Sequence, residues 1–112
     1  LNVENFRSGL ENILRNAIHY AEKTIEVIFT IEAGRLVVVI QDDGPGVKND
    51  DLSRLFEAFY RSENTDVPDS HGAGLGLAIA AHMVKSHKGV IKAENRVPNK
   101  GLKIRLSLPI VE

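Results

Sequence analysis

Residues 37–47, Val-Val-Val-Ile-Gln-Asp-Asp-Gly-Pro-Gly-Val, give the first clear indication of how this 112-residue chain folds. The stretch opens as a run of β-branched residues, which is typical of a largely buried strand. It then stops at two carboxylates, Asp42 and Asp43, and a Gly-Pro-Gly turn. A strand that ends in this way can deliver an acid to the floor of a pocket, and glycines let backbone approach a ligand closely. A tight acidic turn with no further role explains the stretch about as well, because Asp-Gly and Pro-Gly are ordinary turn sequences.

The composition indicates one domain. A chain of 112 residues of which 43% are apolar can fill one core. The net charge of −1 gives no electrostatic footprint for nucleic acid, and the absence of cysteine excludes disulfides and thiolate metal sites. No apolar run is long enough to span a bilayer, and no signal peptide is seen. Because the chain starts with Leu and not Met, we expect it to be a domain of a longer protein.

Apolar residues at helical spacing predict a long first helix, which begins after the N-cap residue Asn2. Asn12 and Asn16 are four residues apart and are therefore neighbours on one face of this helix. His19 and Tyr20 continue the same edge. Asparagine is a poor residue for a helix interior, so this pair indicates either a solvated face or a function.

Four strands are predicted in two adjacent pairs. Residues 24–31 alternate between two faces and pair with residues 36–41 in an antiparallel hairpin. Residues 90–94 and 102–108 form a second hairpin around the turn at 97–101. Strands that come in adjacent pairs favour an α+β fold, in which helices cover one face of a sheet.

Between the hairpins, a short helix from Asn49 or Asp50 to about Phe56 precedes a polar segment, residues 62–73, that has no periodicity. A loop of this length in a compact domain is usually functional or disordered. The glycine-rich residues 72–77 then lead directly into a helix. Glycines at a helix N-terminus make a ready anion site, because free N–H groups and the helix dipole point the same way.

Two glycine-rich turns and a polar connector point to a nucleotide, but the common nucleotide motifs are absent. The chain has no Gly-x-x-x-x-Gly-Lys-Ser/Thr sequence, so it is no P-loop protein. The glycines at 72, 74 and 76 do not follow a strand and lack the dinucleotide spacing, so a Rossmann site is disfavoured. Signatures of Ser/Thr/Tyr protein kinases are also missing.

Four other motifs occur in order: Asn-Ile-Leu-Arg-Asn-Ala at 12–17, Asp-Asp-Gly-Pro-Gly at 42–46, Phe-Glu-Ala-Phe-Tyr-Arg at 56–61 and Gly-Ala-Gly-Leu-Gly-Leu at 72–77. They resemble the N, first glycine, F and second glycine boxes of sensor histidine kinases. The resembling part is the catalytic ATP-binding domain of the gyrase–Hsp90–kinase–MutL superfamily, and the resemblance covers nearly the whole chain. Within the family, the chain is most similar to envelope-stress sensor kinases of Gram-negative bacteria.

The resemblance implies an α+β fold of the Bergerat type, a two-layer α/β sandwich with a mixed sheet covered on one face by helices. It implies that residues 1–112 form the catalytic domain of a longer kinase, and that a further strand lies before Leu1. It also implies a flexible ATP lid over about residues 47–73. We expect residues 62–73 to become more ordered with Mg-ATP, since they have too few apolar side chains to offset their ordering entropy.

The cofactors implied are ATP and Mg²⁺. Asp42 would accept a hydrogen bond from the adenine amino group, and Tyr20 would lie against the purine. Asn16 would hold Mg²⁺ and phosphate oxygens through its amide oxygen, with Asn12 assisting in binding and catalysis. The residues expected at the nucleotide are Asn12, Asn16, His19, Tyr20, Asp42, Gly44, Gly46, Val47, Phe59, Arg61, Gly72, Gly74, Leu75, Gly76 and Leu77.

Two positions depart from the family pattern. His19 stands where the family usually has Lys or Arg, and a neutral imidazole stabilises phosphate less than a fixed cation does. The final glycine box usually reads Gly-Thr-x-Phe, whereas residues 101–104 here are Gly-Leu-Lys-Ile, so that only the glycine matches.

The function implied is transfer of the γ-phosphoryl group of ATP to a histidine on a separate phosphoacceptor domain, for relay to a response regulator. The parent would be a homodimeric kinase of the bacterial inner membrane with this domain in the cytoplasm, in contact with neither nucleic acid nor the membrane. No histidine of this chain is followed by Glu or Asp, as the acceptor should be, so we expect the isolated domain to transfer little phosphate.

Two other functions are weighed against this one. An ATP-hydrolysing machine of the same superfamily would need a Glu general base where this chain has Asn12, whose amide cannot take a proton. A protein-binding module with a vestigial nucleotide site is disfavoured by Asn16, Asp42 and the intact glycine boxes.

Overall fold

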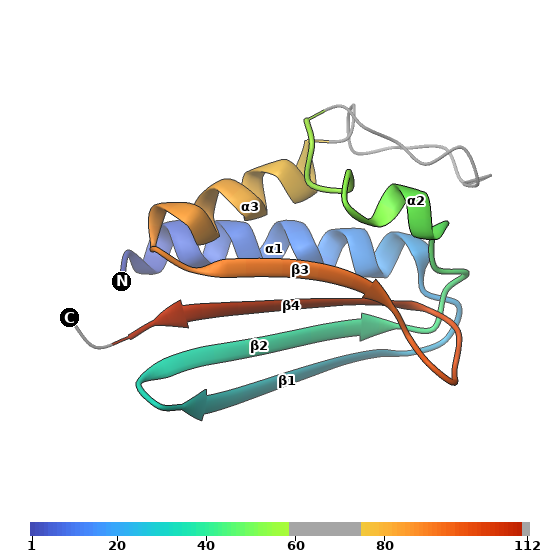
Figure 1. Cartoon of the computed structure of the whole chain (residues 1–112), viewed down its shortest axis with the longest axis horizontal. Coiled ribbons are helices and arrows are strands. Elements are labelled where there is room, and N and C mark those ends of the chain that lie inside the picture. The colour runs from blue at the N-terminus through green and yellow to red at the C-terminus, as the bar shows by residue number, and fades with distance from the viewer. Residues whose placement is uncertain (59–74, 111–112) are drawn as a thin grey trace.

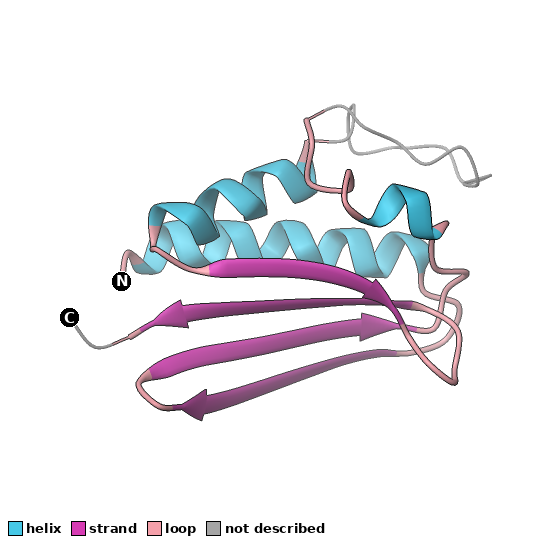
Figure 2. Ribbon diagram, viewed as in Figure 1, coloured by secondary structure: helices cyan, strands magenta, loops and turns pink. Residues whose placement is uncertain are grey.

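The computed structural model describes residues 1–58 and 75–110, which form two layers (Figures 1 and 2). One layer is an antiparallel sheet, and the other contains the helices. In chain order the elements are α1 (Val3–Tyr20), β1 (Ile25–Glu32), β2 (Arg35–Asp42), α2 (Asn49–Leu52), α3 (Gly76–Ser86), β3 (Val90–Asn95) and β4 (Leu102–Pro109). The expected α+β sandwich is therefore confirmed. Of the expected lid, about residues 47–73, the part at 59–73 lies outside the described residues.

The two hairpins meet in the middle of the sheet. The strand order is β1-β2-β4-β3, and each neighbouring pair is antiparallel. The mixed sheet that the resemblance implied is thus wrong for the described strands. The reason is that short turns join β1 to β2 and β3 to β4, and that β2 and β4 then run in opposite directions where the hairpins meet.

The first helix begins where its cap predicts. The side-chain oxygen of Asn2 accepts the backbone N–H of Asn5 at 3.0 Å, which satisfies one of the free N–H groups of the first turn. Glu4 lies in that turn, where a negative charge interacts favourably with the helix dipole. No helix in the described part of the chain is both long and apolar enough to cross a bilayer.

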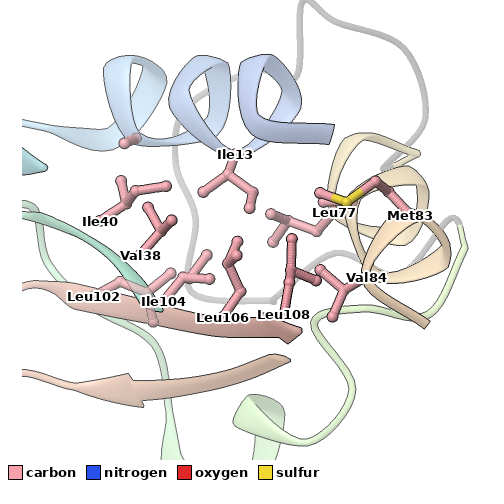
Figure 3. Close-up of a cluster of buried hydrophobic side chains, with 12 residues drawn as sticks. Ile13, Val38, Ile40, Leu77, Met83, Val84, Leu102, Ile104, Leu106 and Leu108 are labelled. Carbon is pink, nitrogen blue, oxygen red and sulfur yellow. The ribbon is translucent and has the colours of Figure 1, made fainter. Parts of the chain in front are cut away.

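The core lies between the helices and one face of the sheet (Figure 3). Val38 of β2 pairs with Leu106 of β4, so alternate residues of both strands share this face. Ile13 of α1 and Val84 of α3 cover them, and all four side chains have no exposed area. The other members of the core are Ala17, Ile40, Leu77, Ala80, Met83, Leu102, Ile104 and Leu108. This core fixes α1 and α3 over β2 and β4.

The edge strand β1 differs from the other strands in its burial. Its register places Val27, Phe29 and Ile31 on the same side of the sheet as Val38. Phe29 is nevertheless 56% exposed and Ile31 is 68% exposed. The cause is the position of the strand, since β1 lies at the sheet edge away from α1 and α3 (Figure 1). The alternation therefore predicted the strand correctly but gave no information on what covers it.

Candidate functional site

Several polar groups meet at one end of the molecule. The C-terminal ends of α1, β2 and β3 lie there together, and α2 follows the turn that leaves β2 (Figure 1). That turn contains the acidic Gly-Pro-Gly stretch, residues 42–46. The fold thus brings three separate segments of the chain around Asp42.

Asp42 is the one buried charged residue in the described part of the chain, at 3% exposure. Its Oδ1 accepts the backbone N–H of Gly44 at 2.8 Å and that of Leu102 at 3.3 Å. Its Oδ2 accepts no hydrogen bond from the described residues. Burial raises the pKa of Asp42 above its ordinary value of 3.8, and the two backbone hydrogen bonds act in the opposite direction. The site therefore holds a carboxylate with one oxygen anchored and the other available to a donor.

Asp43 forms hydrogen bonds with the connection between α1 and β1. Its carboxylate accepts the N–H groups of Glu22 at 2.8 Å and of Lys23 at 3.0 Å. The hydrogen bonds from Lys23, Thr24 and Glu22 lower the pKa of Asp43 to about 2. Asp43 thereby ties the connection between α1 and β1 to the end of β2, next to Asp42.

The hydrogen bonds of Asp43 predict that part of the free energy of unfolding is lost at low pH. Because the pKa of Asp43 falls from 3.8 to about 2 on folding, its contribution is complete above 3.8 and is lost as the pH falls through about 2. Asp43→Asn should therefore lower Tm at neutral pH, and the difference from wild type should vanish in strong acid. Thermal denaturation followed over pH measures this effect. Asp50→Asn, at an exposed acid of α2, is the control; equal losses in both variants would contradict the role of Asp43.

Gly44 allows α1 and the acidic turn to touch. A Cβ atom at Gly44 would lie only 2.4 Å from the carbonyl oxygen of Tyr20, the last residue of α1. No side chain fits this gap, so the glycine sets the distance between Tyr20 and Asp42. The Tyr20 ring also meets the His19 ring edge-on, with centroids 4.8 Å apart. The structure thus brings His19, Tyr20, Asp42 and Gly44 together, and their contact with a nucleotide stays a prediction.

The two asparagines of α1 differ in their partners. The amide nitrogen of Asn12 donates to the carbonyl of Ser8 at 2.8 Å, and its Oδ1 accepts from Arg15 at 3.4 Å. Asn16 is half-buried, and its side-chain amide forms no hydrogen bond with the described residues. A half-buried amide without a partner is suited to a ligand, because desolvated polar groups need hydrogen bonds.

The start of α3 adds free backbone donors. Gly76 is the first residue of α3, and the first helical hydrogen bond at this end runs from the N–H of Ile79 to the carbonyl of Leu75. The N–H groups of residues 76–78 therefore lack helical partners. A Cβ on Gly76 would lie 3.4 Å from Oδ1 of Asn12, so this end of α3 lies against α1. Phe59, Arg61, Gly72 and Gly74, which are also expected at the site, lie outside the described residues.

Leu77 and Val47 take part in packing. Leu77 is 8% exposed and belongs to the core, and Val47 packs against the same core. Only the backbone of Leu77 is left to meet a ligand at the start of α3. The side chain of Leu77 therefore holds α3 on the sheet, and a contact of its backbone with a nucleotide stays a prediction.

Sequence reasoning missed Asn95 and Arg96, which follow one another at the end of β3. The Asn95 side chain accepts the N–H of Val47 at 2.9 Å and donates to the Val47 carbonyl at 2.6 Å. Arg96 donates from Nη1 to the carbonyl oxygen of Asp42 at 2.9 Å. Both belong to no motif, and their partners are about 50 positions away in sequence. The one available signal was the predicted hairpin, which ends its first strand with these polar residues.

Residues 2–112 match the family described as histidine kinase-, DNA gyrase B-, and HSP90-like ATPase. The chain belongs to this family. The sensor histidine kinase CpxA of Escherichia coli strain K12 is 41% identical to it over 103 residues, which are 92% of this chain and 22% of CpxA. This ATPase-family chain thus spans about a fifth of the length of the curated relatives it matches.

Solved structures of histidine kinases share the fold of this family member. The mycobacterial sensor histidine kinase MprB superposes with a TM-score of 0.87 at 29% identity, over 97% of this chain and 74% of that one. Full-length ShkA in complex with AMPPNP gives a TM-score of 0.78 at 28% identity, over 94% of this chain and 21% of that one. The resemblance to sensor histidine kinases is confirmed.

Proposed function

We propose that this domain binds Mg-ATP and donates its γ-phosphoryl group to a histidine on a separate phosphoacceptor domain of the same protein. The arrangement of Asp42 carries the proposal. An ionised carboxylate only accepts hydrogen bonds, and Oδ2, to which no described residue donates, would take one from the amino group of adenine. Guanine carries a carbonyl at that position, so the same carboxylate would repel it. The buried acid therefore selects adenine.

The phosphates would lie toward α1 and α3. Free N–H groups and the positive end of the α3 dipole favour an anion at Gly76. The amide oxygen of Asn16 is an oxygen ligand of the kind Mg²⁺ prefers. The described residues contain no cluster of three or more His, Cys, Asp or Glu that could hold a metal. The ion would thus arrive with the nucleotide, and it would neutralise phosphate charge during transfer.

The protein side of the site favours transfer to an external acceptor over hydrolysis. Phosphoryl transfer is catalysed mainly by positioning and charge stabilisation. The amide of Asn12 is hydrogen-bonded to Ser8 and cannot act as a general base for water. The relatives CpxA and MprB are named sensor histidine kinases, and ShkA was solved with AMPPNP. These names support a nucleotide site used for phosphorylating histidine.

We also make a wider proposal for the parent protein, of which the names support only that it is a sensor kinase. It would be a homodimeric sensor kinase of the bacterial inner membrane, with residues 1–112 as its cytoplasmic catalytic domain. The phosphorylated histidine would pass its phosphoryl group to a response regulator, which completes a two-component pathway.

A nucleotide titration of wild type and Asn16→Ala tests the proposal. Wild type should bind ATP more tightly with Mg²⁺ than without it. Asn16→Ala should lose this Mg²⁺ enhancement, by about tenfold or more, because the amide that orders the ion and phosphates is removed. Adenosine affinity should stay the same, since alanine is the best helix former and α1 should remain intact.

Glu11→Ala, on an exposed position of the same helix, is the matched control. Full Mg²⁺ dependence in Asn16→Ala would contradict the role of Asn16. Transfer is tested by adding the parent's phosphoacceptor domain and γ-labelled ATP, which should give an acid-labile phosphohistidine. Absence of ATP binding by wild type would contradict the proposed function as a whole.

A further inference from the structure

Arg96 holds the end of β2 from the neighbouring hairpin. Its Nη1 donates to the Asp42 carbonyl at 2.9 Å and reaches the Lys100 carbonyl at 3.5 Å. Its backbone N–H donates to the Gly101 carbonyl at 2.8 Å, which closes the turn after β3. One side chain thus joins the turn that follows β3 to the residue that carries the buried carboxylate.

Arg96 also matters for the charge of that carboxylate. Two charged groups act on Asp42: the neighbouring Asp43 raises its pKa, and Arg96 lowers it. Burial has the largest effect and raises the pKa. The hydrogen bonds from the N–H groups of Gly44 and Leu102 come next and lower it, and the effects of the two charges are smaller than these. Among the described residues, Arg96 is therefore the cation that favours an ionised Asp42.

We propose that Arg96 is the positioning residue of the adenine-recognising acid, which it keeps in the orientation and charge state that accept a hydrogen bond. This inference rests on the proposed function, because it assigns Arg96 a task at the same nucleotide site. Arginine suits the task, since its guanidinium stays charged and offers several donors in a fixed geometry. One donor group fixes the backbone of Asp42 while the positive charge acts on its carboxylate.

The surroundings of Arg96 allow a clean substitution. Its side chain is half-buried and borders a polar surface hollow of about 330 Å³. A shorter side chain would let water in and would leave no apolar cavity in the core. The other residues that line the hollow are Gln41, Glu94, Asn95, Val97, Asn99 and Lys103.

The test measures adenosine affinity from about pH 8 down to 3.8, the ordinary pKa of this carboxyl, in wild type, Arg96→Gln and Arg96→Lys. Adenosine has no phosphate, so a general loss of positive charge does not affect it directly. Binding should weaken as the pH falls and Asp42 becomes protonated. In Arg96→Gln this loss should begin at a higher pH, with a raised midpoint. Arg96→Lys keeps the charge and should retain the wild-type midpoint.

Arg105→Gln, at an exposed arginine of β4, is the control and should follow wild type at every pH. The carboxyl resonance of Asp42, titrated by NMR without ligand, should show the same shift in Arg96→Gln. Matching midpoints in Arg96→Gln and wild type would overturn the inference while leaving the proposed function intact. So would a raised midpoint in Arg96→Lys, which tests the inference even if Arg96→Gln does not fold. Failure of wild type to bind adenosine would instead overturn the proposed function.

Discussion

Asp42→Asn should lower the affinity for adenosine by about 10- to 150-fold, because a hydrogen bond to a charged group contributes about 1.5–3 kcal/mol. The amide oxygen of asparagine can replace Oδ1 and accept the N–H groups of Gly44 and Leu102. Its NH₂ group then takes the place of Oδ2. A donor would face the amino group of adenine, which is also a donor, so that recognition is lost while the local backbone contacts remain.

The same variant should not lose stability. The pKa of Asp42 is raised from 3.8 by burial, so the folded state binds the proton more tightly than the unfolded state. Stability therefore falls as the pH rises from 3.8 through the raised pKa, and the ionised carboxylate destabilises the fold at neutral pH. Asp42→Asn removes that charge. Its Tm at neutral pH should equal or exceed that of wild type, and the gap should narrow in acid.

Calorimetric titration with adenosine and thermal denaturation at several pH values measure the two effects. Asp50→Asn removes an acid from the exposed start of α2 and should change neither of them. An unchanged adenosine affinity in Asp42→Asn would contradict the adenine role. A clear fall in its Tm would show that the charge of Asp42 stabilises the fold and would contradict the linkage argument.

Local patterns were sufficient to predict most elements of this fold. Asn2 marked the start of α1, and the β-branched run at 37–40 marked the buried strand that became β2. The adjacent strand pairs predicted two hairpins and hence the α+β class. These predictions succeed because helix caps, turns and strand alternation depend on interactions between residues a few positions apart, which can be read from the sequence alone.

The candidate site was predicted in part. The sequence motifs contain Asp42, Asn12 and Asn16, whose side chains have the chemistry expected of hydrogen-bond acceptors and metal ligands. The hydrogen bonds of Asn95 to Val47 and of Arg96 to Asp42 join residues that are 48 and 54 positions apart in the sequence. No local sequence pattern predicts contacts of this kind. The exposure of Phe29 was also hidden, because burial depends on which helices cover a strand.

The second large effect concerns folding, and it arises at Gly101, the one residue of the final glycine box that matches the family pattern. Gly101 has φ +130°, and a Cβ atom there would lie 1.9 Å from the carbonyl oxygen of Asp42. That oxygen cannot easily move, because it accepts the hydrogen bond from Arg96. Gly101→Ala should therefore destabilise the domain by about 2–6 kcal/mol, from backbone strain and overpacking together.

A loss of this size is a large fraction of the about 5–15 kcal/mol that stabilises a typical domain. Each kcal/mol lowers Tm by about 4–8 °C in a domain of this size, so thermal denaturation should show a fall of about 10 °C or more. Gly76→Ala is the matched control, because a Cβ there lies 3.4 Å from Oδ1 of Asn12 and alanine favours the helix. Its Tm should be unchanged or slightly raised. Equal Tm values for Gly101→Ala and Gly76→Ala would contradict this prediction. They would show that the turn after β3 can move away from Asp42, and that the close contact between this turn and Asp42 does not stabilise the domain.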